Sequence, residues 1–232
     1  MSQPATRVTG ASRFQKQFSW TSADSSGGTS LRVRCSGGTG GSSANDGLHA
    51  RDVVDLGGLR NNPLETLEAR ASARVVRYGL RPDSGGAGTF RGGGGIVFEF
   101  EVLAPDCIMI ARGMERLRFQ PWGLLGGNAG AAGSVWVKRA GESAYKTIPK
   151  PDALRLTIGD MVRLETAGGG GYGDPLLRDA KRVLEDVKNG FVTIEGAERD
   201  YGVIVRNGTL DTAATDALRA KRACSDQAGS DR

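Results

Sequence analysis

Histidine is almost missing from this sequence, since His49 is the only one in 232 residues. A catalytic transition-metal site takes about three protein ligands and favours imidazole among them. No carboxylates at ligand spacing surround His49, so we predict no metal site. A serine or cysteine nucleophile would also lack an ordered base, because His49 lies in serine- and glycine-rich sequence. Residue patterns alone therefore indicate no catalytic residues.

Paired cysteines are missing as well. Cys35, Cys107 and Cys224 lie far apart and no CxxC occurs, which excludes a zinc knuckle. An odd number of cysteines is typical of a reducing compartment, and the first residues hold no apolar signal segment. We expect a cytoplasmic protein.

Long apolar runs and basic clusters are also absent. No stretch approaches the roughly 18 apolar residues that a membrane span needs, so no membrane partner is expected. The net charge is +5, but Lys and Arg are scattered, whereas nucleic-acid binding uses a clustered basic patch. We expect no nucleic-acid partner.

Glycine, in contrast, is abundant, with 36 residues, about twice the usual share of roughly 7%. Residues 1–50 combine glycine with serine and hold few large apolar side chains, so they bury too little surface to offset the entropy of ordering. We predict three parts: a low-complexity, disordered segment over 1–50, a β-rich domain with terminal helices over 51–206, and a short helix with a polar tail over 207–232.

Alternating apolar and polar residues predict strands between residues 72 and 167. Phe98, Phe100 and Val102 would face inward, while Glu99 and Glu101 would face outward. Further strands are predicted over 73–81, 107–112, 134–139 and 161–166. Alternation of this kind is typical of an antiparallel sheet with one wet face. The predicted fold class is α+β, mainly β: an antiparallel β-sandwich or barrel-like unit followed by two short helices.

The period changes to that of a helix after Pro175. Apolar residues recur at helical spacing as far as Val187, with Asp174 or Asp179 as the cap and Gly190 as the terminating glycine.

A second helix is predicted over Ile194–Tyr201. Thr193 would cap its start and Gly202 its end. The residues that follow, Gly202 to Val205, could close as a strand.

The stretch ETAGGGGYGDP, residues 165–175, contains the spacing of a dinucleotide-binding fingerprint in Gly168, Gly170 and Gly173. Three features argue against that function. The preceding strand alternates, Asp174-Pro175 interrupts the loop, and too little chain follows Glu195 to complete a doubly wound sheet. A P-loop is excluded because no Lys-Ser/Thr follows the glycines. We interpret the glycines as sites of close backbone packing, and predict no cofactor-binding residue in this chain.

A second glycine cluster, residues 81–95, holds polar residues without any phosphate-binding pattern. It is either a wide turn or a loop that shapes a cavity or a subunit contact. The two clusters together supply the candidates for substrate binding or subunit contact: Asp83, Ser84, Arg91, Tyr172 and Asp174.

Four longer stretches resemble one family. NNPLETLEARASARVVRYGLRPDSGGAGTFRGGGGI (61–96), RFQPWGLLGGNAGAAG (118–133), LRLTIGDMVRLETAGGGGYGDP (154–175) and RVLEDVKNGFVTIEGAERDYGVIV (182–205) are similar to the C-terminal part of the hydantoinase B/oxoprolinase family. The resemblance runs from about Asp52 to Val205. That family includes N-methylhydantoinase and hydantoin-utilisation B subunits, half of 5-oxoprolinase, and large subunits of acetone and acetophenone carboxylases.

The resemblance implies ATP-dependent chemistry at an amide or ketone. It implies a hydantoinase A-type partner subunit that binds ATP, and a divalent metal held by an N-terminal part of the B-type subunit. Residues 1–50 do not resemble that part, so they are interpreted as non-family sequence and no metal ligand is transferred to this chain. The short length predicts a truncated or frameshifted reading frame, or a module that works beside a separately encoded N-terminal half.

Three functions follow as expectations. The first is the C-terminal portion of a hydantoinase B/5-oxoprolinase-type subunit, associated with ATP-dependent hydrolysis of a cyclic amide such as hydantoin or 5-oxoproline and inactive alone. The second is a fragment of an acetone- or acetophenone-carboxylase-like subunit. The third is a non-catalytic assembly module that docks a partner through its glycine loops and strand edges.

Overall fold

The structure is a computed structural model that describes residues 16–22, 29–51, 63–112, 115–149 and 153–230. Its strands and helices, in chain order, are β1 (Lys16–Ser22), β2 (Thr29–Cys35), α1 (Leu64–Arg70), β3 (Ala73–Leu80), β4 (Ile96–Val102), β5 (Cys107–Arg112), η2 (Glu115–Leu117), β6 (Ser134–Lys138), β7 (Lys146–Thr147), β8 (Leu154–Leu156), β9 (Met161–Glu165), η3 (Pro175–Leu177), α2 (Ala180–Lys188), α3 (Ile194–Tyr201), β10 (Val205–Arg206), β11 (Thr209–Leu210) and α4 (Thr212–Ser230).

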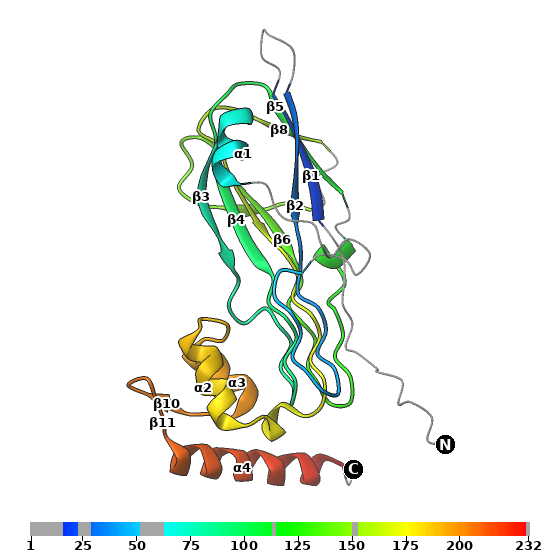
Figure 1. Cartoon of the computed structure of the whole chain (residues 1–232), viewed down its shortest axis with the longest axis vertical. Coiled ribbons are helices and arrows are strands. Elements are labelled where there is room, and N and C mark those ends of the chain that lie inside the picture. Colours follow the sequence, from blue (N-terminus) through cyan, green and yellow to red (C-terminus); the bar gives the residue numbers. More distant parts are fainter. Residues whose placement is uncertain (1–15, 23–28, 52–62, 113–114, 150–152, 231–232) are drawn as a thin grey trace, which may run out of the picture.

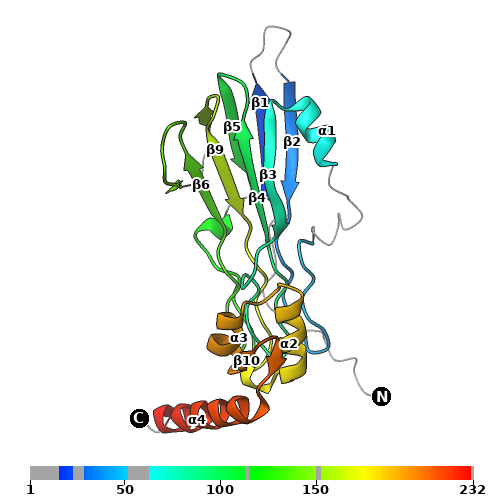
Figure 2. The same ribbon diagram turned by 90° about the vertical axis from the view of Figure 1, so that its left-hand side faces the viewer.

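Two antiparallel sheets form one end of an elongated molecule (Figures 1 and 2). One has the strand order β2-β1-β5-β8 and the other the order β3-β4-β9-β6-β7. A shared apolar core lies between them, to which the first sheet gives Cys107 and Met109 and the second gives Phe98, Phe100 and Val162. With most of its helices toward the C-terminus, the chain is an α+β protein built on an antiparallel sandwich, which confirms the predicted fold class.

The central strand β4 follows the predicted alternation with one difference. Phe98, Phe100 and Val102 are buried in the core as expected. Glu99, predicted to face water, is only 7% exposed, because Tyr145 and Arg163 cover its carboxylate and hydrogen-bond to it. The outer face of this sheet is therefore partly covered, which alternation alone does not reveal.

Below the sandwich, four glycine-rich segments run side by side as extended chain (Figure 1). They comprise residues 36–51, 81–95, 121–133 and 166–174, and backbone hydrogen bonds join them to one another. Gly93 N–H donates to Thr39, Gly169 N–H to Gly93, and Gly171 N–H to Asn128, at 2.8–2.9 Å. We call these four segments the glycine bundle.

Glycine is required in this bundle because backbones lie where side chains would otherwise stand. A Cβ on Gly169 would lie 1.9 Å from the Thr39 carbonyl oxygen, and one on Gly170 would lie 1.9 Å from that of Trp122. The same reasoning explains glycine at the crowded axis of collagen. The four consecutive glycines that resemble a nucleotide-binding loop are thus packed against neighbouring backbones, as the structural interpretation of the sequence predicted.

Helices close the other end of the bundle. The Asp179 side chain caps α2, the Thr193 hydroxyl caps α3, and left-handed Gly202 ends α3. The predicted helix over Ile194–Tyr201 is confirmed to the residue, since caps are local signals. Val205 pairs with Leu210 in a small β10-β11 hairpin.

The C-terminus differs from the predicted short helix and polar tail, because α4 continues through Thr212–Ser230. Thr215 is buried, and the Arg219 guanidinium donates to the carbonyls of Tyr201 and Arg178. These contacts hold α4 against the preceding elements. The helix therefore continues through residues whose composition is polar.

The predicted disorder of residues 1–50 also differs from the structure where it is described. Residues 16–22 and 29–35 form β1 and β2, and β1 lies between β2 and β5. Residues 36–50 belong to the glycine bundle, so they gain backbone hydrogen bonds where apolar burial is small. Residues 1–15 and 23–28 of the predicted segment lie outside the described residues.

Candidate functional site: a buried ionic cluster beside the glycine bundle

Arg178 stands at the centre of a cluster of charged side chains where the bundle meets α2. Its side chain is 1% exposed. Nη1 and Nη2 donate to the two carboxylate oxygens of Asp46 at 2.7 and 2.8 Å, and Nη2 also donates to Asp186 at 2.8 Å. Arg182 reaches Asp46 from the exposed rim. Two carboxylates thus hold one buried guanidinium.

Arg91 and His49 extend this cluster into the glycine bundle. Arg91 donates to both oxygens of Asp186 at 3.3 Å and lies 3.2 Å from His49 Nε2. Nδ1 of His49 accepts the Gly94 N–H at 2.9 Å, and its ring lies against that of Phe191. We call Asp46, His49, Arg91, Arg178 and Asp186 the ionic cluster.

The electrostatics of the cluster fix its protonation states. Burial alone would raise the pKa of Asp46, but the hydrogen bonds and positive charges of Arg178 and Arg91 hold it below its usual value. Burial and the neighbouring Arg91 charge lower the pKa of His49, against the opposing effect of Asp186 and Asp46. At neutral pH Asp46 is therefore a carboxylate and His49 a neutral imidazole.

This arrangement suits a structural role better than a role in proton transfer. Most of its donors and acceptors have partners inside the protein, although Arg178 Nε has none among the described residues. Its members come from two segments of the glycine bundle and from the region of α2. The cluster therefore joins residues 46–49 and 91 to residues 178–186. We infer that it locks the helical end onto the bundle.

Of the residues singled out from the sequence, Asp83 and Ser84 have internal partners. The Asp83 carboxylate accepts hydrogen bonds from the backbone N–H and hydroxyl of Thr193, at the start of α3. The Ser84 hydroxyl donates to the Arg81 carbonyl and accepts the Gly95 N–H. Both side chains thus hold the second glycine cluster in place.

Tyr172 and Asp174 lie on the bundle, beside the segment that contains Arg91. Tyr172 forms backbone bridges with Phe90 and Leu124, and the Asp174 carboxylate caps η3 through the Leu176 N–H. The structure therefore brings the two predicted glycine clusters together, but it places only Arg91 of the five candidates in the ionic cluster.

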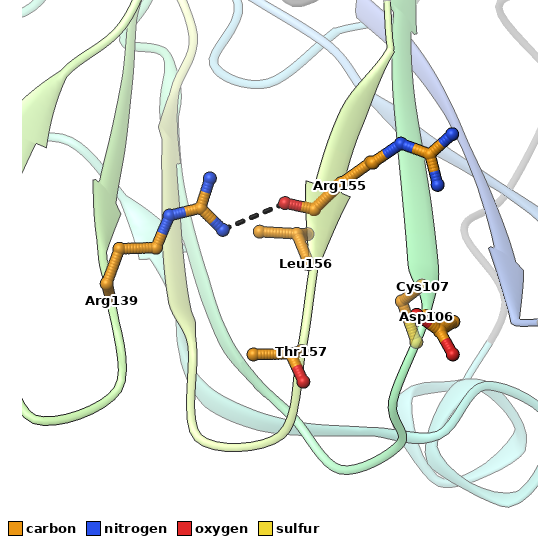
Figure 3. Close-up of a pocket in the computed structure, with 6 residues that line it drawn as sticks. All are labelled: Asp106, Cys107, Arg139, Arg155, Leu156 and Thr157. Atoms are coloured by element: carbon orange, nitrogen blue, oxygen red, sulfur yellow. Dashed lines mark hydrogen bonds between the residues drawn. The ribbon is translucent and has the colours of Figure 1, made fainter.

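A small surface cavity of about 170 Å³ lies at the other end of the molecule, near the β5-β8 pairing (Figure 3). Asp106, Cys107, Arg139, Arg155, Leu156 and Thr157 line it. Arg139 donates to the Arg155 carbonyl at 2.8 Å and pairs with Asp160. Burial, with the nearby Asp106 charge, raises the pKa of the Cys107 thiol, so that thiol stays protonated and is a poor nucleophile.

No trio of His, Cys, Asp or Glu side chains suited to a metal ion occurs within the described residues. In the same part of the chain, no helix is long and apolar enough to cross a membrane.

Sequence reasoning missed Asp46, His49, Arg178 and Asp186 as a group. His49 was assigned to disordered sequence, and the three others are ordinary charged residues at unremarkable spacing. Only the close approach of residue 46 to residues 178 and 186 reveals them, and no local pattern encodes that approach.

The glycine bundle and the sandwich together define a known class of protein. The model of the hydantoinase B/oxoprolinase family matches residues 5–175, and the chain belongs to that family. The match begins well before residue 50, so the interpretation of residues 1–50 as non-family sequence is corrected.

Named relatives and solved structures agree with this assignment. The caprolactamase subunit beta of Pseudomonas jessenii is 37% identical over 192 residues, covering 79% of this chain and 32% of the relative. The crystal structure of the ATP-dependent caprolactamase from the same organism has a TM-score of 0.74 at 28% identity and covers 92% of this chain and 38% of that chain. Nucleotide-free acetone carboxylase has a TM-score of 0.78 at 20% identity, with 92% and 33% covered, which shows the shared fold.

The chain spans only 25% to 32% of the length of the first three curated relatives that it matches. It therefore corresponds to part of a family subunit.

Proposed function

We propose that this chain supplies the C-terminal portion of a hydantoinase B-type subunit that takes part in ATP-dependent hydrolysis of a cyclic amide. The observation that carries the proposal is the family match over residues 5–175, together with the likeness to an enzyme named ATP-dependent caprolactamase. A caprolactam ring, like hydantoin and 5-oxoproline, is a cyclic amide. The common chemistry is opening of the ring at its amide bond.

We propose further that ATP binds to a hydantoinase A-type partner subunit. A phosphate-binding loop offers free backbone N–H groups to its ligand. In this chain, the N–H groups of Gly168, Gly169 and Gly171 donate to carbonyls of neighbouring segments, so they are not free for phosphate. The relative from Pseudomonas jessenii is itself named as one subunit of an enzyme, which supports a partner.

The divalent metal of such an enzyme would be held by the part of the B-type subunit that this chain does not cover. In this chain, both carboxylates of the ionic cluster, Asp46 and Asp186, are already paired with Arg178 and Arg91. A metal ion would have to displace those guanidinium groups. We therefore assign to this chain a scaffold role in the complete active site, and expect it to be inactive alone.

The test is a reconstitution assay with caprolactam, hydantoin and 5-oxoproline as substrates. The purified chain, with ATP and a divalent metal, should open none of these rings. Turnover should appear once both the A-type partner and the remaining part of a B-type subunit are added. ATP-dependent ring opening by the unaided chain would refute the scaffold assignment.

The same assay separates the two other functions. Acetone with bicarbonate and ATP tests a carboxylase, for which the likeness to acetone carboxylase supports only the fold. A chain that binds the other parts without changing their rates would be a non-catalytic assembly module. Matched preparations with and without the chain distinguish that outcome from a catalytic contribution.

A further inference from the structure

Three large apolar side chains stand exposed within seven residues of one another. Phe119 and Trp122 are each 60% exposed and Leu125 is 74% exposed. Aromatic residues make up only 6% of the chain, so two exposed in one short segment are unusual here. We call Phe119, Trp122 and Leu125 the apolar ridge. Closely spaced exposed apolar side chains of this kind mark interaction sites more often than isolated ones do.

The backbone beneath the ridge is held firmly. The Leu124 N–H donates to Gly171, the Gly127 N–H closes a turn onto Leu124, and the Gly130 N–H donates to Pro121. Trp122 and Leu125 thus stand on backbone that is fixed to the glycine bundle. A rigid presenting surface loses less conformational entropy when it binds.

Leu125 occupies a position that neither solvation nor backbone preference favours. Its φ is +50°, in the left-handed region where glycine and asparagine are the favoured residues, and its side chain faces solvent. The backbone is held there by internal hydrogen bonds of Leu124 and Gly127, while the Leu125 side chain gains little burial within the described residues. Local conflicts of this type cluster at functional surfaces.

Two cationic side chains lie over the aromatic rings of the ridge. The Arg116 guanidinium lies 5.5 Å from the Trp122 ring centroid, and that of Arg118 lies 5.5 Å from the Phe119 ring centroid. Aromatic and arginine side chains together are the residue types enriched at binding hot spots. On the side of Phe119 and Trp122, the complementary surface is therefore an apolar pocket with Asp or Glu carboxylates at its rim.

We propose that the apolar ridge docks into such a carboxylate-rimmed pocket on the part of a family B-type subunit that lies outside this chain. The inference rests on the proposed function. In each of two solved relatives, 92% of this chain matches, yet the match covers only 33% and 38% of the relative. Most of each relative's chain therefore lies beyond the part that corresponds to this one. A permanent interface with it would be more apolar than a transient one.

The experiment compares side-chain oxidation by hydroxyl radicals in the isolated 232-residue chain and in a chimera. In the chimera, this chain replaces the matched segment of the caprolactamase subunit beta of Pseudomonas jessenii. Mass spectrometry then gives an oxidation rate for each residue. We expect Phe119 and Trp122 to be oxidised at least tenfold more slowly in the chimera. Val76 and Ile158, which are exposed on the sandwich end, serve as controls and should keep their rates.

A second measurement uses two separate polypeptides. The chain is mixed with the same caprolactamase subunit lacking its matched segment, and complex formation is measured by light scattering after gel filtration. Trp122→Gln combined with Leu125→Asn should weaken binding at least tenfold, because asparagine tolerates the left-handed backbone while the apolar contact is lost. Val76→Thr combined with Ile158→Thr is the matched control and should bind like the unmodified chain.

The possible results test the ridge proposal and the proposed function independently. Unchanged oxidation of Phe119 and Trp122 in a chimera that opens caprolactam with ATP would overturn the ridge proposal and leave the function standing. Protection in an inactive chimera would support the ridge and count against the function. Protection in the isolated chain that disappears on dilution would assign the ridge to a second copy and overturn the proposal.

Discussion

Arg178 and Asp46 are 132 residues apart in the sequence, yet their side chains form a two-armed ion pair with hydrogen bonds of 2.7 and 2.8 Å. This pair joins the first glycine-bundle segment to the loop before α2. Because the Arg178 side chain is almost fully buried, the pair is shielded from salt and solvent, unlike ion pairs on the surface. It is therefore one of the contacts that hold the helices against the bundle.

Asp186→Asn should destabilise the protein strongly, since it leaves Arg178 and Arg91 buried with less compensating charge. Breaking a buried ion pair in this way costs about 3–5 kcal/mol. Asp200→Asn is the matched control, because Asp200 pairs with Arg199 at the surface and such pairs contribute about 0–1 kcal/mol. Urea unfolding of the two variants measures both values, and equal midpoints would contradict a structural role for the ionic cluster.

Gly169→Ala should be among the most damaging single-methyl additions to this chain. The new Cβ would lie 1.9 Å from a carbonyl oxygen of another segment, so two backbones would have to separate. We expect a loss at or above the upper end of the roughly 1–3 kcal/mol typical of overpacking. Gly79→Ala on β3 is the control, since nothing lies within 4 Å of its Cβ position. A thermal melt that places both variants at the same Tm would refute backbone packing as the reason for glycine.

His49 should make stability depend on pH just below neutrality. Its pKa in the folded protein lies below the usual 6.5, so protons bind preferentially to the unfolded chain as the pH falls below that value. Stability is therefore complete above pH 6.5 and declines as the pH drops through the interval down to the folded pKa. Asp46, Asp186 and Arg91 are the charged groups that face the ring.

His49→Gln should flatten this part of the profile, because glutamine keeps an acceptor for the Gly94 N–H without titrating. Since the chain has only one histidine, the assignment is unambiguous among imidazoles. Guanidinium unfolding at pH 8, 6.5 and 5 provides the measurement. An unmodified protein that is equally stable at all three values would show that the ring is not held neutral.

Tyr145 should ionise with a pKa of about 12, raised first by burial and then by its hydrogen bond to the Glu99 carboxylate. The raised pKa means that its contribution to stability is present below pH 10 and is lost as the pH rises through about 12. Difference absorbance at 295 nm should lose one high-pH step in Tyr145→Phe. Glu99→Gln should move that step to lower pH, and an unmoved step would exclude the carboxylate as a cause.

The sequence by itself determined the features that depend on neighbouring residues. Alternation in residues 96–102 placed Phe98 and Phe100 in the core, and the Thr193 and Gly202 signals fixed both ends of α3, because capping and strand faces are settled within a few residues. The family was also visible in the ordered motifs between residues 61 and 205. These local signals can be recognised in the sequence because they do not depend on how the rest of the chain folds.

Only the tertiary structure decided that residues 16–22 and 29–51 are ordered, and which residues form the ionic cluster. Low-complexity sequence predicted disorder, but residues 16–22 and 29–35 pair as strands. Residues 36–51 are held by backbone hydrogen bonds and by close approaches of their glycines to neighbouring backbones, which leave no side-chain pattern to detect. Likewise, Asp46 becomes a partner of Arg178 only after four separate segments have been brought side by side. Contacts between distant segments depend on the whole fold, and a local pattern cannot encode them.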